Sequence, residues 1–203
     1  MLLKIYETLL KHFGPQGWWP MQNGFSTPEW EVCVGAILTQ NTSWSNVEKA
    51  LGNLKNEGIL NKEDIKKICT EKLAELIRPA GYYNQKSRKL KMLASFNGGV
   101  SRNSLLGIWG IGRETADSIL LYAYGKPCFV VDAYTKRIFS RLGLVREDSD
   151  YESVRKYFES GLPKNPDIYK EFHALIVRLG KDFCRKKPSC SGCPLVPMCR
   201  HGK

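Results

Sequence analysis

A short glycine-containing turn, Gly110-Ile111-Gly112, opens into a segment with apolar residues at helical spacing, and Asp132 follows a further apolar run. Glycine adopts positive φ without strain, so this turn can bring its backbone N–H groups close to a ligand. The helix expected after Gly112 directs its N-terminus the same way, which favours a phosphate. The segment therefore predicts binding of a nucleic-acid backbone that does not depend on base sequence. It also places a carboxylate a fixed distance downstream.

Four cysteines near the C-terminus form a second group of chemical interest. They lie within 16 residues and are Cys184, Cys190, Cys193 and Cys199. Five, two and five residues separate consecutive members. Four thiolates that converge on one point are what an iron–sulfur cluster or a structural zinc requires. A single C-x-x-C between two wider gaps does not give the paired knuckles of a zinc ribbon. The spacing therefore favours a [4Fe–4S] cluster over zinc.

The charge balance indicates a polyanionic partner. The chain carries 31 Lys and Arg residues against 20 acidic residues, a net charge of +11, which predicts attraction to nucleic acid. Charge alone is also compatible with a generally basic protein. Between the first two cysteines, Arg185, Lys186 and Lys187 either contact phosphates or form a solvated run that offsets an anionic cluster. Four further cations are interpreted as a solvated face that can also touch phosphates: Lys86, Arg88, Lys89 and Lys91.

Nothing in the sequence predicts a membrane or an export segment. No stretch approaches 18 apolar residues, and the N-terminus lacks the apolar core and cleavage site of a signal peptide. We therefore expect a cytoplasmic protein, associated with the nucleoid if its source is prokaryotic. In that reducing compartment the cysteines are thiols or metal ligands. Cys33, Cys69 and Cys128 stand in apolar surroundings and are expected in the core.

Helical periodicity dominates the chain. Thr27 is suited to an N-cap with Pro28 at the first helical position, and the only β-branched run, Cys128–Val131, is too short for a sheet. The prediction is an all-α protein with about ten short helices. The expected helical segments are Leu2–Phe13, Pro28–Leu38, Ser45–Leu54, Lys62–Cys69, Glu71–Ile77, Asn84–Phe96, Ser101–Ile108, Arg113–Tyr124, Tyr134–Leu142, Tyr151–Ser160 and Asp167–Phe183.

An ordered set of motifs resembles the helix–hairpin–helix (HhH-GPD) DNA glycosylases, and in particular their endonuclease III-like branch. The set comprises LTQNTSWSNV, YYNQK, IWGIGRETA, VVD and the four cysteines. The resemblance implies two helical lobes with damaged double-stranded DNA in the groove between them, and we expect a monomer. A six-helix barrel would span residues 22–130, with the hairpin motif at about 101–125. Residues 1–21 and 131–203 would form the second lobe, with the cluster loop at 184–199.

The resemblance also implies roles for residues near the hairpin. Gln40 resembles the residue that fills the gap left by a flipped nucleotide, although by itself it is a polar residue at a helix end. Asn41 either reads a base edge or caps a turn. The DNA backbone would be held by the hairpin residues Gly110, Ile111, Gly112 and Arg113.

Asp132 has two compatible interpretations. An Asp before a helix is commonly an N-cap, and its residue type alone favours that role. The resemblance makes it the essential carboxylate, 18 residues after Glu114, which would stabilise a sugar with oxocarbenium character and take a proton from water. Strand-cutting members of the family carry a lysine nucleophile where this chain has Glu114. A carboxylate cannot form a Schiff base, so the resemblance implies a monofunctional glycosylase.

The tryptophans indicate which class of base the protein excises. Trp18, Trp19 and Trp44 resemble the aromatic residues with which the 3-methyladenine branch of this superfamily sandwiches a flipped alkylated purine. Such a purine is cationic, and an indole face attracts a cation by about 0.5–2 kcal/mol. The alternative for each Trp is core packing, which we expect for Trp30 and Trp109.

The sequence thus predicts a monofunctional DNA N-glycosylase of base excision repair that removes alkylated purines, with 3-methyladenine as the foremost substrate. One alternative is an endonuclease III-like enzyme for uracil or thymine mismatches or for oxidised pyrimidines, because a stacked neutral base also tolerates tryptophan. An alternative of another class is a non-catalytic DNA-binding protein that uses the hairpin for phosphates and the cysteines for zinc.

Overall fold

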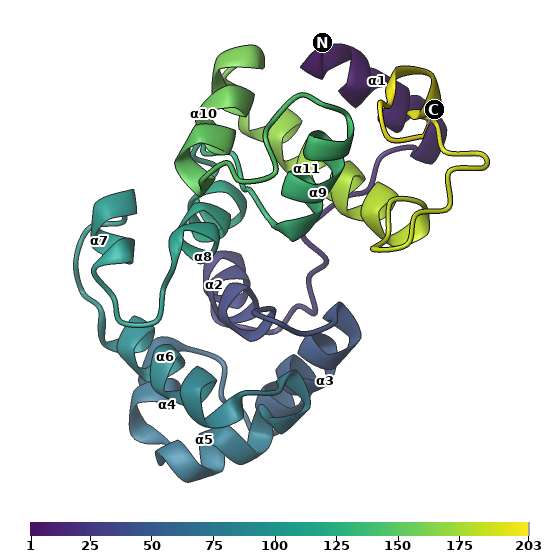
Figure 1. Ribbon diagram of the computed structural model, residues 1–203. Coiled ribbons are helices and arrows are strands. Elements are labelled where there is room, and N and C mark those ends of the chain that lie inside the picture. Colours follow the sequence, from purple (N-terminus) through teal and green to yellow (C-terminus); the bar gives the residue numbers. More distant parts are fainter. Residues whose placement is uncertain (203) are drawn as a thin grey trace. The chain divides into compact units, whose positions relative to one another are not determined.

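The computed structural model describes residues 1–202, and these form helices joined by turns, with no strand among them (Figure 1). The expected all-α class is confirmed. The chain divides into two compact units. The central unit is Trp19–Tyr124, and the terminal unit combines Met1–Trp18 with the described residues from Gly125 onward. No helix in the described part of the chain is long and apolar enough to cross a membrane.

The central unit is built around one fully buried helix. Every residue of α2 (Pro28–Leu38) from Trp30 onward is buried, because its sequence is apolar on nearly all sides. The side chain of Thr27 accepts a hydrogen bond from the Trp30 N–H and Pro28 begins the helix, as expected. The other elements of this unit are α3 (Trp44–Asn56), α4 (Lys62–Lys67), α5 (Thr70–Leu76), η1 (Arg78–Ala80), α6 (Tyr83–Ser95), α7 (Arg102–Leu106), α8 (Arg113–Ser118) and η2 (Ile119–Ala123).

An ion pair inside the central unit ties together the two helices that flank the glycine turn. Arg102 at the start of α7 donates two hydrogen bonds, of 2.7 and 3.0 Å, to the carboxylate of Asp117 on α8. The Asp117 side chain is fully buried. A paired, buried carboxylate of this kind is costly to separate from its partner, so the pair holds the two helices, and the turn between them, in one arrangement.

The terminal unit has an aromatic core. Phe129 stacks on Phe158 at a centroid distance of 4.1 Å, and Phe139 and Phe172 pack against the same ring. In Figure 1, α9 and α11 lie side by side within this unit. The elements are α1 (Leu2–Phe13), α9 (Ala133–Arg141), α10 (Tyr151–Gly161), α11 (Pro166–Asp182) and η3 (Val196–Met198).

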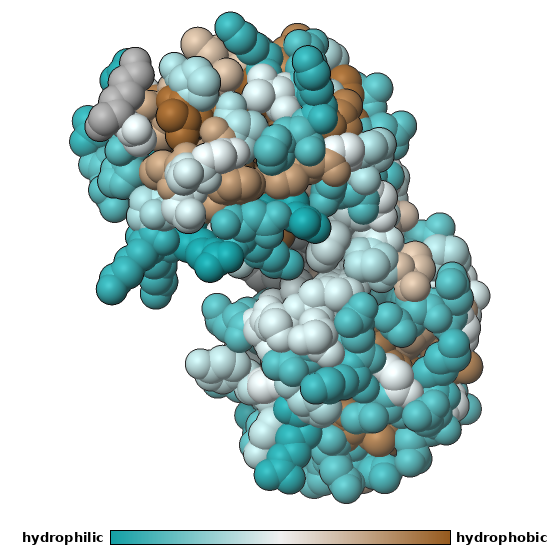
Figure 2. All heavy atoms as spheres, turned by 90° about the vertical axis from the view of Figure 1, so that its right-hand side faces the viewer, coloured by the Kyte–Doolittle hydropathy of each residue, from teal (hydrophilic) through white to brown (hydrophobic). Residues whose placement is uncertain are grey.

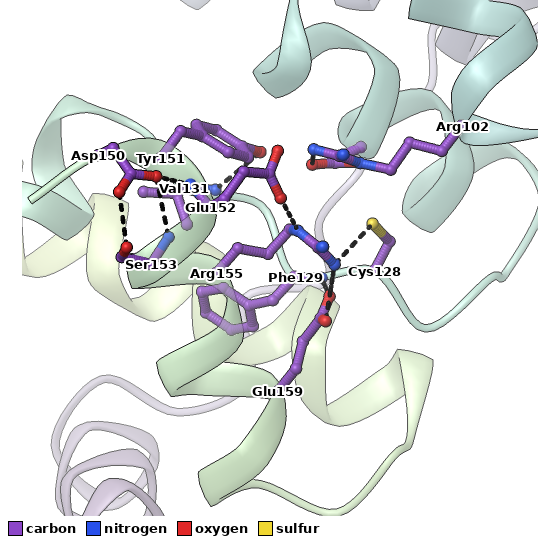
Figure 3. A network of polar contacts seen from close by, with 11 residues as sticks. Arg102, Cys128, Phe129, Val131, Asp150, Tyr151, Glu152, Ser153, Arg155 and Glu159 are labelled. Atoms are coloured by element: carbon purple, nitrogen blue, oxygen red, sulfur yellow. Dashed lines mark hydrogen bonds and ion pairs between the residues drawn. The ribbon is translucent and has the colours of Figure 1, made fainter.

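The extended segment that leads to Asp132 is anchored on α10 (Figure 3). The Phe129 N–H donates to the carboxylate of Glu159 at 2.9 Å. Arg155 holds that carboxylate with hydrogen bonds of 2.7 Å and also donates to Glu152. Residues 125–130 belong to the terminal unit, whereas the sequence analysis expected residues up to 130 in the barrel. The other boundary also lies earlier than expected, between Trp18 and Trp19.

Several expectations about burial need correction. Cys33 and Cys128 are buried as expected, but Cys69 is exposed because it precedes α5 as its N-cap. Trp109 is 55% exposed because it stands on the turn between α7 and α8 rather than on a packed helix face. Lys86, which was interpreted as part of a solvated face, is 1% exposed. On the face that Figure 2 shows, hydrophilic residues predominate and hydrophobic residues form small patches.

Candidate functional site

The glycine turn has the geometry of a backbone hairpin, but only one of its glycines needs positive φ. Gly110 has φ of 83°, and a Cβ there would lie 2.5 Å from the side chain of Lys89. Ile111 is buried and anchors the turn. Gly112 has an extended φ of −86° and is the N-cap of α8, with Arg113 exposed on the first turn. The turn therefore presents backbone amides and one cation at the start of α8.

Gln40 and Lys89 form a polar chain behind this turn. The Gln40 amide donates to the hydroxyl of Thr115 at 2.9 Å, and Lys89 Nζ donates to the Gln40 side-chain oxygen at 2.5 Å. Burial lowers the pKa of Lys89. Asn41 is exposed and adopts a left-handed φ of 53°, a conformation that Asn tolerates better than most residues. Gln40 is thus held in place, whereas the Asn41 side chain faces solvent.

Three aromatic rings of the central unit meet at Trp19. Its ring lies edge-on to Trp44 with centroids 5.1 Å apart, and Tyr122 of η2 lies 5.2 Å away on a tilt. Gly35 of α2 makes room for this, because a Cβ there would lie 2.9 Å from the Trp19 ring. We call Trp19, Trp44 and Tyr122 the aromatic cluster. Trp18 falls in the terminal unit.

The sequence reasoning missed two aromatic residues. Tyr122 stands in an apolar helical pattern, which by itself indicates only a core position. Tyr82, directly before α6, is 65% exposed and has a left-handed φ of 46°. For a bulky residue that conformation is unusual and costs energy. An exposed aromatic ring can stack on a base, but the exposure and the backbone conformation that single out Tyr82 are visible only in the structure.

Asp132 lies at the N-terminus of α9 and has partners for both carboxylate oxygens. Oδ1 accepts hydrogen bonds from the Thr135 N–H at 2.7 Å and from the Thr135 hydroxyl at 2.8 Å, which confirms the cap. Oδ2 lies 3.7 Å from Nε2 of His173 on α11. Burial raises the pKa of this carboxyl, but His173 and Thr135 more than offset it, so the pKa lies below its ordinary value. A carboxylate that stays ionised although only 13% of its side chain is exposed can stabilise positive charge.

Among the four C-terminal cysteines, Cys193 is influenced by the other three. Burial raises the pKa of the Cys193 thiol, and the other three thiols raise it further. Arg141 Nη1 donates to Cys184 Sγ at 3.3 Å, and Arg137 Nε donates to the Cys184 carbonyl at 2.9 Å. Within residues 1–202, no three His, Cys, Asp or Glu side chains are close enough together to hold a metal ion. The thiols nevertheless fit a metal cluster in donor type and number, and they are near enough to interact electrostatically.

The cations of the first cysteine loop are exposed. Arg185 donates to the Lys181 carbonyl at 2.7 Å, while the carbonyls of Arg185 and Lys186 accept hydrogen bonds from Arg141. Lys187 is also exposed. The loop backbone is therefore fixed by Arg141, and the exposed side chains of Lys186 and Lys187 can reach an anion. Within the terminal unit a cavity of about 800 Å³ has a basic lining, which includes Arg137, Arg141, Lys186, Arg200 and His201.

The hairpin, the capped aspartate and the two helical units define a helix–hairpin–helix DNA glycosylase fold. The family model described as HhH-GPD superfamily base excision DNA repair protein matches residues 34–164. The chain therefore belongs to the HhH-GPD family and is a DNA glycosylase of base excision repair.

The proteins to which the chain is similar include a 3-methyladenine DNA glycosylase and endonuclease III. A Methanocaldococcus jannaschii protein, named provisionally as a DNA repair glycosylase, is 50% identical over 98% of this chain and 96% of its own. The structure of the H. pylori 3-methyladenine DNA glycosylase bound to 1,N6-ethenoadenine is 35% identical, with a TM-score of 0.76 over 89% of this chain and 95% of that one. A trapped endonuclease III–DNA covalent intermediate is 25% identical, with a TM-score of 0.85 over 100% and 97%.

Proposed function

We propose that this protein is a monofunctional DNA N-glycosylase that excises alkylated purines, with 3-methyladenine as the foremost substrate. The observation that carries the proposal is the aromatic cluster, in which Trp19 is seated against Gly35 and meets Trp44 and Tyr122. Similarity to the H. pylori 3-methyladenine DNA glycosylase supports it. A purine alkylated on a ring nitrogen is cationic, so electron-rich indole faces attract it by about 0.5–2 kcal/mol.

Asp132 supplies the carboxylate for bond cleavage in this proposal. The target nucleotide must first leave the base stack, because its glycosidic bond cannot be reached inside a duplex. As the bond between the sugar and the base breaks, positive charge develops on the sugar. The ionised Asp132 stabilises that charge and takes a proton from the attacking water. A cationic base leaves as a neutral molecule, so the reaction needs no strong general acid.

Glu114 makes the proposed enzyme monofunctional. It lies in the first turn of α8 and is exposed. This is the position at which the family's strand-cutting members carry a nucleophilic lysine. A carboxylate does not condense with the aldehyde of an abasic site, so we expect base release without cleavage of the strand.

The proposed partner is damaged double-stranded DNA, bound by a monomer. Gln40 fills the gap left by the flipped nucleotide, and Asn41 and Trp18 contact a base. The DNA backbone is held by hairpin amides and by cations, namely Gly110, Ile111, Gly112, Arg113, Arg185, Lys186 and Lys187.

In the same proposal Cys184, Cys190, Cys193 and Cys199 hold a [4Fe–4S] cluster. The support is their number, their chemistry and the influence of the other three thiols on Cys193. A cluster there would fold the C-terminal loop and so position its basic residues. Iron and sulfide analysis of anaerobically purified protein tests this, with zinc analysis as the alternative outcome. A preparation that excises bases but contains neither iron nor sulfide would exclude the cluster.

A lesion panel tests the proposed function directly. Duplexes that carry 3-methyladenine, ethenoadenine, a uracil or thymine mismatch or an oxidised pyrimidine are incubated with the protein and analysed with and without alkali. We expect abasic sites at 3-methyladenine and strand breaks only after alkali. Asp132→Asn should lower the excision rate by roughly 100-fold or more while DNA binding persists. The matched control is Asp148→Asn, an exposed carboxylate of the same unit, which should excise normally.

A second candidate is an endonuclease III-like specificity. It is favoured by the structural match to the endonuclease III–DNA complex over the whole chain. Preferred excision of a mismatched or oxidised pyrimidine in the same panel would select this candidate and remove the alkylated-purine proposal. Binding without excision of any lesion would favour the non-catalytic alternative.

A further inference from the structure

The two oxygens of Asp132 face different partners within the terminal unit. Oδ1 accepts both hydrogen bonds from Thr135, which start helix α9. Oδ2 faces Nε2 of His173 at 3.7 Å. Because Oδ1 accepts the two hydrogen bonds of the helix cap, Oδ2 is the oxygen that can act in catalysis. The environment of that oxygen is therefore set by an imidazole from a different helix.

His173 is rigidly supported. It lies in the middle of α11, the 17-residue helix of the terminal unit, and only 10% of its side chain is exposed. Its helix neighbours Phe172, Leu175 and Ile176 are fully buried, so α11 cannot rotate without disrupting the core. In structures without substrate, catalytic hydrogen bonds are often long and tighten only in the complex. A separation of 3.7 Å is consistent with such a contact.

We infer that His173 is a positioning residue for the proposed glycosylase reaction, whose imidazole holds in place Oδ2 of Asp132, the oxygen that accepts no hydrogen bond from Thr135. The inference rests on the proposed role of Asp132. An imidazole that donates its Nε2–H to Oδ2 restrains rotation of the carboxyl group and leaves its negative charge intact. No proton needs to move between the two residues. Burial disfavours the charged carboxylate, and this contact counteracts that effect.

Two substitutions at the same position separate this role from packing. His173→Met fills a similar volume without a hydrogen-bond donor, whereas the amide nitrogen of His173→Gln can reach the place of Nε2. We expect the single-turnover excision rate of His173→Met to fall about 10–100-fold, the usual range for a lost hydrogen bond to a charged group. Its DNA affinity should stay within about threefold, and His173→Gln should recover most of the rate.

Leu175→Val is the matched control, since Leu175 is a buried apolar residue of the same helix. It should reduce the thermal stability and leave the excision rate of the folded protein unchanged. The inference is overturned if His173→Met retains the wild-type rate, or if His173→Gln loses as much rate as His173→Met does. The second result would assign His173 to packing.

A measurement without substrate completes the test. The pKa of the Asp132 carboxyl is followed by NMR on protein with isotope-labelled aspartate. It should rise in His173→Met, because the imidazole contributes to its lowering, and should not change in Leu175→Val. An unchanged pKa in His173→Met would contradict the contact. If wild-type protein excises none of the lesions, the proposed function fails, whereas this pKa comparison still decides whether His173 controls Asp132.

Discussion

The ammonium group of Lys89 lies 2.5 Å from the side-chain oxygen of Gln40, and the Gln40 amide donates to Thr115 at 2.9 Å. Both ends of the Gln40 side chain are therefore occupied before DNA arrives. The stem of Lys89 also packs against Gly110, where a Cβ would collide with it. Lys89 thus connects the residue proposed to fill the duplex with the hairpin proposed to hold the backbone.

This connection predicts a selective defect in Lys89→Met. Gln40 would lose the partner that fixes its oxygen, so insertion into the duplex would carry a larger entropic cost. We expect affinity for DNA with a stable abasic-site analogue to fall roughly tenfold, equivalent to about 1.4 kcal/mol. Affinity for undamaged duplex should change less. Fluorescence anisotropy with both duplexes at fixed salt provides the measurement.

Arg88→Met is the control for the lost charge, because Arg88 is exposed on the same helix. It should weaken binding to both duplexes by a similar factor, as a phosphate contact does. An equal loss on both duplexes in Lys89→Met would assign Lys89 to the same general electrostatic role and remove its link to Gln40.

The packing of the Trp19 ring against Gly35 predicts a second defect. In Gly35→Ala the added Cβ would approach the Trp19 ring to 2.9 Å, so the ring must shift within the aromatic cluster. We expect excision of 3-methyladenine to slow by about tenfold, because a misplaced stacking partner costs on the order of 1 kcal/mol. Single-turnover kinetics and the affinity for undamaged DNA are measured, and the affinity should not change.

Gly52→Ala is a matched substitution on α3, where a Cβ meets no other atom within 4 Å. It should stabilise the protein by about 0.5–1 kcal/mol because alanine is the better helix former, with normal excision. If Gly35→Ala excised at the wild-type rate, the cluster would be a packing feature and not the base pocket.

Local signals made much of the fold predictable from the sequence. The helix Leu2–Phe13 ends before Gly14 as expected, and α2 begins at Pro28 under the Thr27 cap. These boundaries depend on residues within a few positions of one another, which sequence reasoning can evaluate. The Asp132 cap was predictable for the same reason, since its partner Thr135 is three residues away.

Long-range contacts were not predictable in this way. His173 stands far along the chain from Asp132, and its apolar neighbours indicate only a core position. Lys86 lies in the polar stretch YYNQKSRKLK, which reads as a solvated face. Its burial follows from two carbonyls contributed by other elements. Trp109 shows the opposite error. Its large apolar side chain suggests a core position, but its place on the turn exposes it.

Glu114 allows a gain-of-function prediction. Wild-type protein should not be trapped covalently on abasic DNA by borohydride, since a carboxylate cannot form a Schiff base. Glu114→Lys should become trappable, because it restores an amine in the first turn of α8. Loss of an acidic residue there costs about 0.3–1 kcal/mol through the helix dipole, so the fold should persist. Denaturing gels of the reduced mixtures provide the measurement.

Glu114→Gln serves as the control for the lost charge and should give no covalent adduct. A trapped adduct with the wild-type protein would show that another amine acts as the nucleophile, and the enzyme would then not be monofunctional.

Lys86 predicts a dependence of stability on pH. Its Nζ donates to the carbonyls of Leu38 and Ala80 at 2.8 and 2.7 Å, and burial, with a contribution from Lys89, lowers its pKa from 10.5 to about 8. Lys86→Met would leave two buried carbonyls without this donor, so we expect a loss of about 2 kcal/mol or more at pH 7. Urea unfolding of both proteins measures it.

The pH dependence has a definite sign. Below pH 8, Lys86 is protonated in both the folded and the unfolded chain. Between pH 8 and 10.5 the unfolded chain binds more protons at this site than the folded chain, so wild-type stability rises with pH. The stability difference between wild type and Lys86→Met should therefore widen across that interval. A difference that stays constant from pH 7 to 10 would mean that the buried ammonium keeps an ordinary pKa, its burial being fully compensated by the two carbonyls it contacts.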